Sequence, residues 1–155
     1  GQDFGQLREW SEARELDWYL LAEPEHQALQ NFYRDLLHLY THNKAMYEQD
    51  TCMEGFEWVN ADDSSRSIYS FIRHSKGAKK NLLFVCNFTP VARPDYRVGV
   101  PKRGTYTLLL DQEHGYYKRG DKISHYRSIK SECDGQPYSF AYPLPAYGTA
   151  VFRFS

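Results

Sequence analysis

Two histidines spaced four residues apart are the first candidates for chemistry in this chain. His38 and His42 would lie on one face of a helix, as the two zinc-binding imidazoles of an H-E-x-x-H motif do. Leu39 and Tyr40 follow His38, however, so the general-base glutamate of that motif is missing. A catalytic zinc site also needs a third protein ligand. We therefore predict no metal site here.

Two other short motifs have structural explanations. Asp62 and Asp63 form a pair of carboxylates, but they belong to the polar stretch 62–65 between two alternating apolar segments, which is typical of a hairpin turn. The sequence at 87–89 is a glycosylation sequon, yet it falls in a predicted buried strand and precedes Pro90. We interpret neither motif as functional.

The elements that position these residues change in period along the chain. The apolar residues of the stretch 1–22 show neither helical nor strand-like spacing, which predicts a long structured loop. Pro24 suits a first helical turn, and a helix is predicted over 24–40. Its apolar stripe consists of Leu29, Phe32, Tyr33, Leu36, Leu37 and Tyr40. We expect this helix to pack on one side on the β-sandwich predicted below, and residues 1–22 to be mobile or held by a neighbouring molecule.

After about residue 50 the apolar period becomes two. The predicted strands are 56–61, 67–73, 82–88, 96–100, 105–110, 137–142 and 149–154. The stretch 82–88 is almost continuously apolar and should be a central strand. This spacing predicts an antiparallel β-sandwich. The residues predicted to be largely buried in it are Ile68, Ile72, Leu83, Val85, Leu108, Phe152 and Phe154.

Charge and cysteine usage limit the function classes. The formal net charge is −1, so no global field would attract nucleic acid or an anionic membrane. Residues 1–50 carry ten acidic and four basic side chains, whereas residues 51–155 carry ten and fifteen, which indicates two segments. The three cysteines are widely spaced without C-x-x-C, which favours a reducing cytoplasm over a disulfide framework. The sequence shows no signal peptide or long apolar run, and it opens like an internal start in a larger protein.

Six stretches in order along the chain resemble the end of bacterial glycogen branching enzymes of the α-amylase superfamily. The matching stretches are GQDFGQLREW at 1–10, ELDWYLL at 15–21, FYRDLLHLY at 32–40, GFEWVNADD at 55–63, LLFVCNFTPV at 82–91 and YRVGVPKRGTY at 96–106. The chain departs from the family at Asp3, where glutamate is usual, and at 116–120, where the family is richer in glycine.

The resemblance implies a mainly β fold with two parts. Residues 1–48, a loop plus the helix 24–40, resemble the tail of a catalytic (β/α)8 barrel, and residues 49–155 resemble the all-β C-terminal sandwich. In such enzymes an aspartate nucleophile, a glutamate acid/base and a second aspartate lie in the barrel, and none of the acids here matches their motifs. The family cleaves α-1,4-glucan and transfers the segment to a 6-hydroxyl without metal or organic cofactor. The chain alone is expected to be inactive, with the upstream barrel and the glucan or glycogen as its partners.

The same resemblance singles out candidate binding residues. Gln6, Arg8, Trp10 and Trp18 would line the rim of the barrel's glucan cleft, although the two tryptophans can equally serve only to pack the loop. Tyrosines can form a sugar-stacking platform or simply fill strands. The tyrosines considered are Tyr116, Tyr117, Tyr126, Tyr138, Tyr142 and Tyr147.

Two alternatives remain open from the sequence. The chain can be an independent glucan-binding module, which needs an exposed aromatic platform that works without a barrel. It can also be the C-terminal domain of an amylase-type glycoside hydrolase, which differs only in using water as the acceptor. Residues 1–40 argue against a free module, since they make sense only as the tail of a barrel, and only the stretches that resemble branching enzymes favour that family over the hydrolase.

Overall fold

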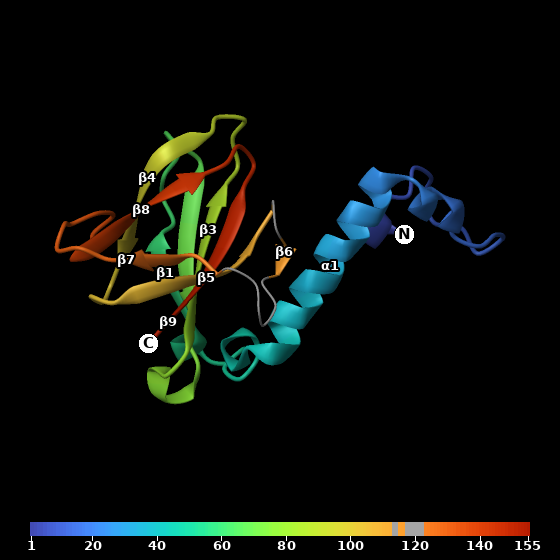
Figure 1. The fold of residues 1–155 in the computed structure, drawn as a ribbon. Coiled ribbons are helices and arrows are strands. Elements are labelled where there is room, and N and C mark those ends of the chain that lie inside the picture. The colour runs from blue at the N-terminus through green and yellow to red at the C-terminus, as the bar shows by residue number, and fades with distance from the viewer. Residues whose placement is uncertain (113–114, 117–122) are drawn as a thin grey trace.

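A computed structural model describes residues 1–112, 115–116 and 123–155 of the chain. One long helix, α1 (Pro24–His42), follows two 3-10 turns, η1 (Gln2–Phe4) and η2 (Trp18–Ala22). It extends away from a body of β-strands, with the N-terminus at its far end (Figure 1). Pro24 occupies the first helical turn, as the sequence predicts, and the helix continues to residue 42 rather than 40.

The strands form two antiparallel sheets. The larger sheet has the order β1-β2-β3-β9-β5-β6, with β7 also paired to β5, and the smaller pairs β4 with β8. The strands are β1 (Phe56–Asn60), β2 (Ile68–Arg73), β3 (Asn81–Asn87), β4 (Arg93–Val100), β5 (Thr105–Asp111), β6 (Gly115–Tyr116), β7 (His125–Arg127), β8 (Tyr138–Leu144) and β9 (Thr149–Phe154). The short turns η3 (Lys44–Met46), η4 (Met53–Gly55) and η5 (Lys76–Ala78) connect the elements.

The main core lies between the two sheets. All seven residues predicted to be buried are at most 4% exposed, and they pack with side chains of β4 and β8 such as Val98 and Phe140. The predicted central strand β3 pairs with β2 on one side and β9 on the other. The all-β sandwich predicted from the period-two pattern is therefore confirmed, while β6 and β7 had escaped prediction.

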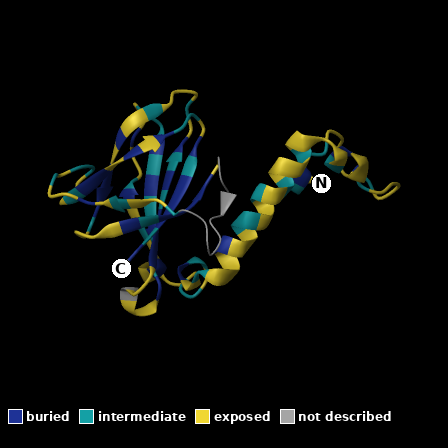
Figure 2. Cartoon of the chain, viewed as in Figure 1, coloured by how far each residue is buried: buried dark blue, intermediate teal, exposed yellow. Residues whose placement is uncertain are grey.

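A second, smaller cluster lies on the opposite face of the larger sheet, under α1. Leu39 of the helix packs with Leu82, Leu110 and Val151 of the sheet, and Phe32 and Leu36 lean on the same cluster. The helix thus covers the sheet from one side, as expected. Within the helix, Phe32, Leu36 and Leu39 make this contact, whereas Leu29, Tyr33, Leu37 and Tyr40 remain 37–65% exposed. Figure 2 shows the buried residues concentrated in the sheets and the exposed ones along α1.

Candidate functional site

The N-terminal segment folds back onto the start of α1. Gly5 ends the turn η1 with a left-handed backbone (φ 69°), which glycine adopts without steric cost. This reversal buries Phe4 completely and brings its carbonyl to His26, whose Nδ1 donates a hydrogen bond of 2.7 Å. The ring of Trp18 packs on Phe4 with centroids 5.2 Å apart. The segment thus contacts the helix here, and its predicted mobility stays a prediction.

An ion pair closes the loop between these two contacts. Arg8 Nε donates to Asp17 Oδ2 over 2.8 Å, and a second guanidinium nitrogen pairs with the other carboxylate oxygen. Gln6 joins the pair, because its Oε1 accepts from the Asp17 backbone (2.9 Å) and its Nε2 donates to the Arg8 carbonyl (3.0 Å). The hydrogen bonds from Arg8 hold the pKa of Asp17 below its ordinary value, and the pKa of Arg8 is raised in turn. Gln6 and Arg8 are therefore held in fixed positions.

A hollow of about 760 Å³ lies beside this loop at the N-terminal end of the chain. Gln6, Arg8 and Trp10 lie in its wall together with Tyr33 of α1, whereas Trp18 is not among the lining residues. Trp10 is 72% exposed. The structure thus brings three of the four predicted rim residues together, and it adds Tyr33. Its place on the apolar stripe was the only sequence signal for Tyr33.

A second surface, which the sequence reasoning missed, runs across the helix-facing side of β1, β2 and β3. The rings of Phe71 and Phe84 stack with centroids 4.7 Å apart at 5°, and Phe56 stacks on Phe71 at 5.3 Å. Trp58 meets both Phe56 and Phe71 edge to face. We call Phe56, Trp58, Phe71 and Phe84 the aromatic ladder. Trp58 is 52% and Phe56 39% exposed, so half of the ladder lies open at the surface.

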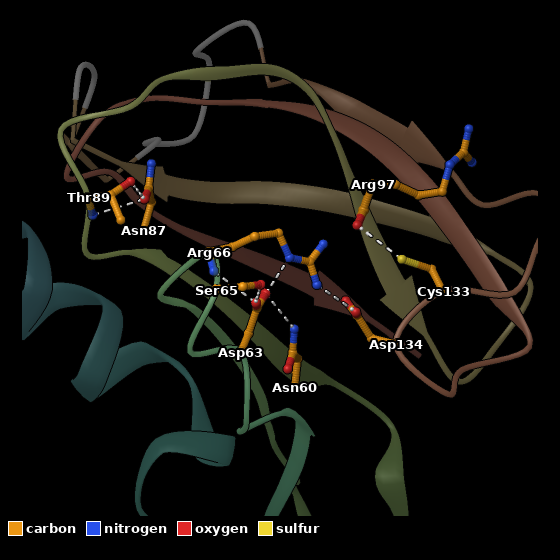
Figure 3. A network of polar contacts seen from close by, with 9 residues as sticks. All are labelled: Asn60, Asp63, Ser65, Arg66, Asn87, Thr89, Arg97, Cys133 and Asp134. Atoms are coloured by element: carbon orange, nitrogen blue, oxygen red, sulfur yellow. Dashed lines mark hydrogen bonds and ion pairs between the residues drawn. The ribbon is translucent and has the colours of Figure 1, made fainter.

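The Asp62-Asp63 pair proves to be a turn. Asp63 accepts hydrogen bonds from Ser65, from the backbone of Arg66 and from Asn60, and Arg66 also pairs with Asp134 at 3.1 Å (Figure 3). Burial works to raise the pKa of Asp63, but the hydrogen bonds and charge of Arg66 bring it below its ordinary value. The network ties the β1–β2 turn to the turn before β8, which is a structural role.

The sequon at 87–89 and the two histidines of α1 also make structural contacts. Asn87 is 3% exposed, and its Nδ2 already donates to the carbonyls of Val91 and Pro145, so that nitrogen is committed (Figure 3 shows its contacts with Thr89). The rings of His38 and His42 lie 5.6 Å apart. In the part of the chain that the structure describes, no group of three or more His, Cys, Asp or Glu gathers as metal ligands.

The tyrosines do not assemble into one platform among the described residues. Tyr142 is 3% exposed in the main core, and Tyr126 and Tyr138 pack against that core, so the strand-filling alternative holds for these three. Tyr147 is exposed at a turn with φ 51°. The side chain of Tyr116 and the whole of Tyr117 lie outside the described residues, and their sugar-stacking role stays a prediction.

Comparison with known proteins identifies two levels of similarity. Residues 58–155 match the family described as the alpha amylase, C-terminal all-beta domain. Over 99% of its length the chain is 46% identical to a 1,4-alpha-glucan branching enzyme GlgB of Butyrivibrio fibrisolvens and 40% identical to one of Gloeobacter violaceus. A GlgB of Aquifex aeolicus is 39% identical over 94% of the chain.

The chain spans only 21–24% of the length of these three relatives. None of the helices in the described residues is long and apolar enough to cross a membrane. The family match runs from Trp58 within β1 to the last residue, and the two-sheet core described above agrees with an all-β domain. The chain therefore belongs to the family of α-amylase C-terminal all-β domains.

Proposed function

We propose that this chain is the C-terminal accessory part of a 1,4-α-glucan branching enzyme. One observation carries the proposal: proteins with that name match the chain over 99% of its length, including residues 1–57, which the all-β family match leaves out. A domain shared with amylases in general would be expected to match only over the sandwich. The similarity of the first 57 residues therefore favours the branching enzyme over an amylase-type hydrolase.

Residues 1–48 are, in this proposal, the tail of the catalytic barrel, and residues 49–155 are the separate sandwich. The exposed stripe of α1 and the open half of the aromatic ladder support the division. Contiguous apolar surface on one side of a small protein marks an interaction site. The proposed partner is the upstream barrel of the same polypeptide.

The reacting groups of the whole enzyme belong to that upstream part. A carboxylate attacks C1 of the donor glucan, and an acid protonates the leaving 4-oxygen as the α-1,4 bond breaks. The 6-hydroxyl of an acceptor glucan then loses its proton to the same acid/base residue and displaces the carboxylate. None of these reaction steps uses a metal ion or an organic cofactor. The proposed setting is the bacterial cytoplasm, with glucan or glycogen as the substrate.

The hollow at the N-terminal end supplies the part of the substrate cleft that this chain contributes. Trp10 presents an exposed indole face on which the apolar face of a glucose unit can stack, while Gln6 and Arg8 offer hydrogen-bond donors beside it. The Arg8–Asp17 pair fixes the loop that carries Trp10. Trp18 stays in the proposal as the support of Phe4 below the rim.

Two assays with iodine staining and reducing-sugar detection test the proposal. The full-length protein is expected to lower the iodine colour of amylose without releasing reducing ends in proportion, whereas this chain alone does neither. Reducing ends released without branching by the full-length protein would assign it to the hydrolases. Turnover by this chain above the blank, in a preparation free of host enzymes, would contradict the proposal that the reacting groups lie upstream of this chain.

The second candidate function, an independent glucan-binding module, is favoured by the exposed Trp58 and Phe56 of the aromatic ladder. Electrophoresis of the chain through gels that contain glycogen separates the two readings. Retardation that Trp58→Ala abolishes, while Tyr147→Ala leaves it intact, would support the module. Equal mobility with and without glycogen leaves the accessory role in place.

A further inference from the structure

A strongly basic hollow lies beside the C-terminal end of α1, far along the helix from the N-terminal loop. Its volume is about 410 Å³, within the range of small-molecule sites. The lining includes five Lys and Arg side chains and one carboxylate, a net charge of +4 in a chain whose total is −1. The cations are Lys44, Lys76, Lys79, Lys80 and Arg153.

The cations reach this hollow from three separate elements. Lys44 belongs to η3, Arg153 lies in β9, and the other three belong to the connection between β2 and β3. That connection is fixed by its own hydrogen bonds: Ser75 N donates to Asn81 Oδ1 (3.2 Å), and Lys80 N donates to Ser75 Oγ (3.3 Å). The fold therefore places the lysine backbones together before any ligand arrives.

Neighbouring carboxylates do not neutralise this charge. Among the described residues, Glu48 is the only acid that pairs with any of the five, and it lies 3.9 Å from Lys44. Its other oxygen accepts the backbone N–H of Lys76 over 3.0 Å. Like charges within a Debye length of about 8 Å repel one another and favour the binding of an anion.

Among the described residues, the end of α1 makes no hydrogen bond with a lysine side chain of the hollow. Cations are favourable near the C-terminus of a helix, where carbonyls lack partners. Here Asn43 Nδ2 donates to the Leu39 carbonyl (2.8 Å), and His42 Nδ1 donates to the His38 carbonyl (2.9 Å). Thr41 Oγ1 donates to the Leu37 carbonyl (2.9 Å). Of the four terminal carbonyls, only that of Leu39 is thus capped by a side chain in the described part of the chain, while Thr41 and His42 bond carbonyls of the preceding turn.

We propose that this hollow, the lysine hollow, is a binding site for a phosphate monoester. A phosphate monoester carries close to two negative charges near neutral pH and has several acceptor oxygens, so it matches several ammonium groups in one compact space. Lysine binds phosphate as a point charge and does not need a planar partner. A nucleic acid fits less well, because residues 1–50 carry a net charge of −6 and would repel a long polyanion.

The phosphate can come from a free sugar phosphate or from a phosphorylated glucan chain. Only the identity of the sugar depends on the proposed branching function. Binding of inorganic phosphate to the hollow does not depend on it. Experiments can therefore disprove phosphate binding while they confirm branching, or confirm phosphate binding while they disprove branching. The two proposals are tested separately.

The test compares two triple variants of this chain with equal loss of charge. Lys76→Gln, Lys79→Gln and Lys80→Gln remove exposed cations from the hollow, whereas the control removes exposed Lys102, Arg103 and Lys130 elsewhere. Inorganic phosphate and glucose 6-phosphate are titrated at constant ionic strength, and backbone amide shifts of residues 76–80 are followed by NMR. The wild type and the control are expected to saturate, and the hollow variant to bind at least tenfold more weakly.

Three outcomes would overturn the site. They are an absence of saturable shifts in the wild type, equal weakening in both triple variants, and the same shifts with chloride at matched ionic strength. Gels that contain phosphorylated amylopectin, or the same polymer after phosphatase, distinguish the sources. Retardation by the phosphorylated polymer alone assigns a glucan-linked phosphate, and glucose 6-phosphate binding without retardation assigns a free sugar phosphate.

Discussion

The N-terminal 42 residues and the sandwich use apolar side chains in opposite ways. In the sandwich the apolar side chains of the two sheets pack on one another, and large core residues such as Phe152, Ile68 and Leu83 are fully buried. In the N-terminal region Phe4, Leu20 and Leu39 are buried, whereas Leu7, Trp10, Tyr19 and Leu37 are 65–79% exposed. A closed apolar core and a segment with many exposed apolar side chains thus share one chain.

Truncation in the sandwich core should produce the largest effect. Phe152→Ala removes a ring that contacts Phe140, Tyr142 and Tyr126, and a loss of about 3–5 kcal/mol of unfolding free energy is expected. Leu37→Ala on the exposed stripe should change stability by no more than about 0.5 kcal/mol. Urea denaturation of both variants measures the difference, and equal losses would erase the contrast between the two regions.

The second prediction tests the exposed stripe of α1 in the full-length protein. If the barrel covers α1, Leu37→Asp places a charge in a buried interface and forfeits about 1.5–3 kcal/mol of apolar burial. The same change in this chain alone, where Leu37 is 65% exposed, should be nearly neutral. Thermal unfolding of both lengths gives the comparison. A similar small effect in both would show that the barrel leaves the stripe uncovered.

Substitution of the exposed indole tests the cleft-rim role. In the full-length protein Trp10→Ala should weaken glucan use by about 0.5–1.5 kcal/mol, the typical value of one aromatic contact, which is about twofold to tenfold in kcat/KM. Trp10→Phe should restore most of it. The stability of this chain should not change, because Trp10 is 72% exposed. An unchanged kcat/KM in Trp10→Ala would leave only a packing role.

The smallest effect is expected for the Arg8–Asp17 ion pair that closes the N-terminal loop, here called the loop clamp, and for its pH dependence. Asp17 has a lowered pKa, so its ion pair with Arg8 contributes fully above the unfolded value of about 3.9 and is lost as pH falls through the lowered folded value. Asp17→Asn should speed hydrogen exchange in residues 1–17 at neutral pH and leave the sandwich unchanged. Glu12→Gln, an exposed acid of the same loop, is the control. Equal exchange in both variants would show that the clamp does not hold the loop.

The sequence predicted most of the sandwich because alternation is a local signal. Six of the seven predicted strands match the observed bounds within two residues at each end, and β4 begins three residues earlier than predicted. Of the four rim candidates, three meet in one hollow. The lysine hollow escaped prediction, since Lys76, Lys44 and Arg153 lie far apart in sequence and only the fold brings them together.

By itself the sequence determined the strand-rich class, the helix from Pro24 and seven residues of the main core, because each follows from a periodicity of neighbouring residues. Strict alternation would place Leu110 on the same face as Leu108. In the structure a register shift in β5 places Leu108 in the core between the sheets and Leu110 under α1. Such a bulge is decided by how β5 pairs with β9, a contact between distant segments. Tertiary packing likewise decided which side chains of α1 and of the aromatic ladder stay exposed.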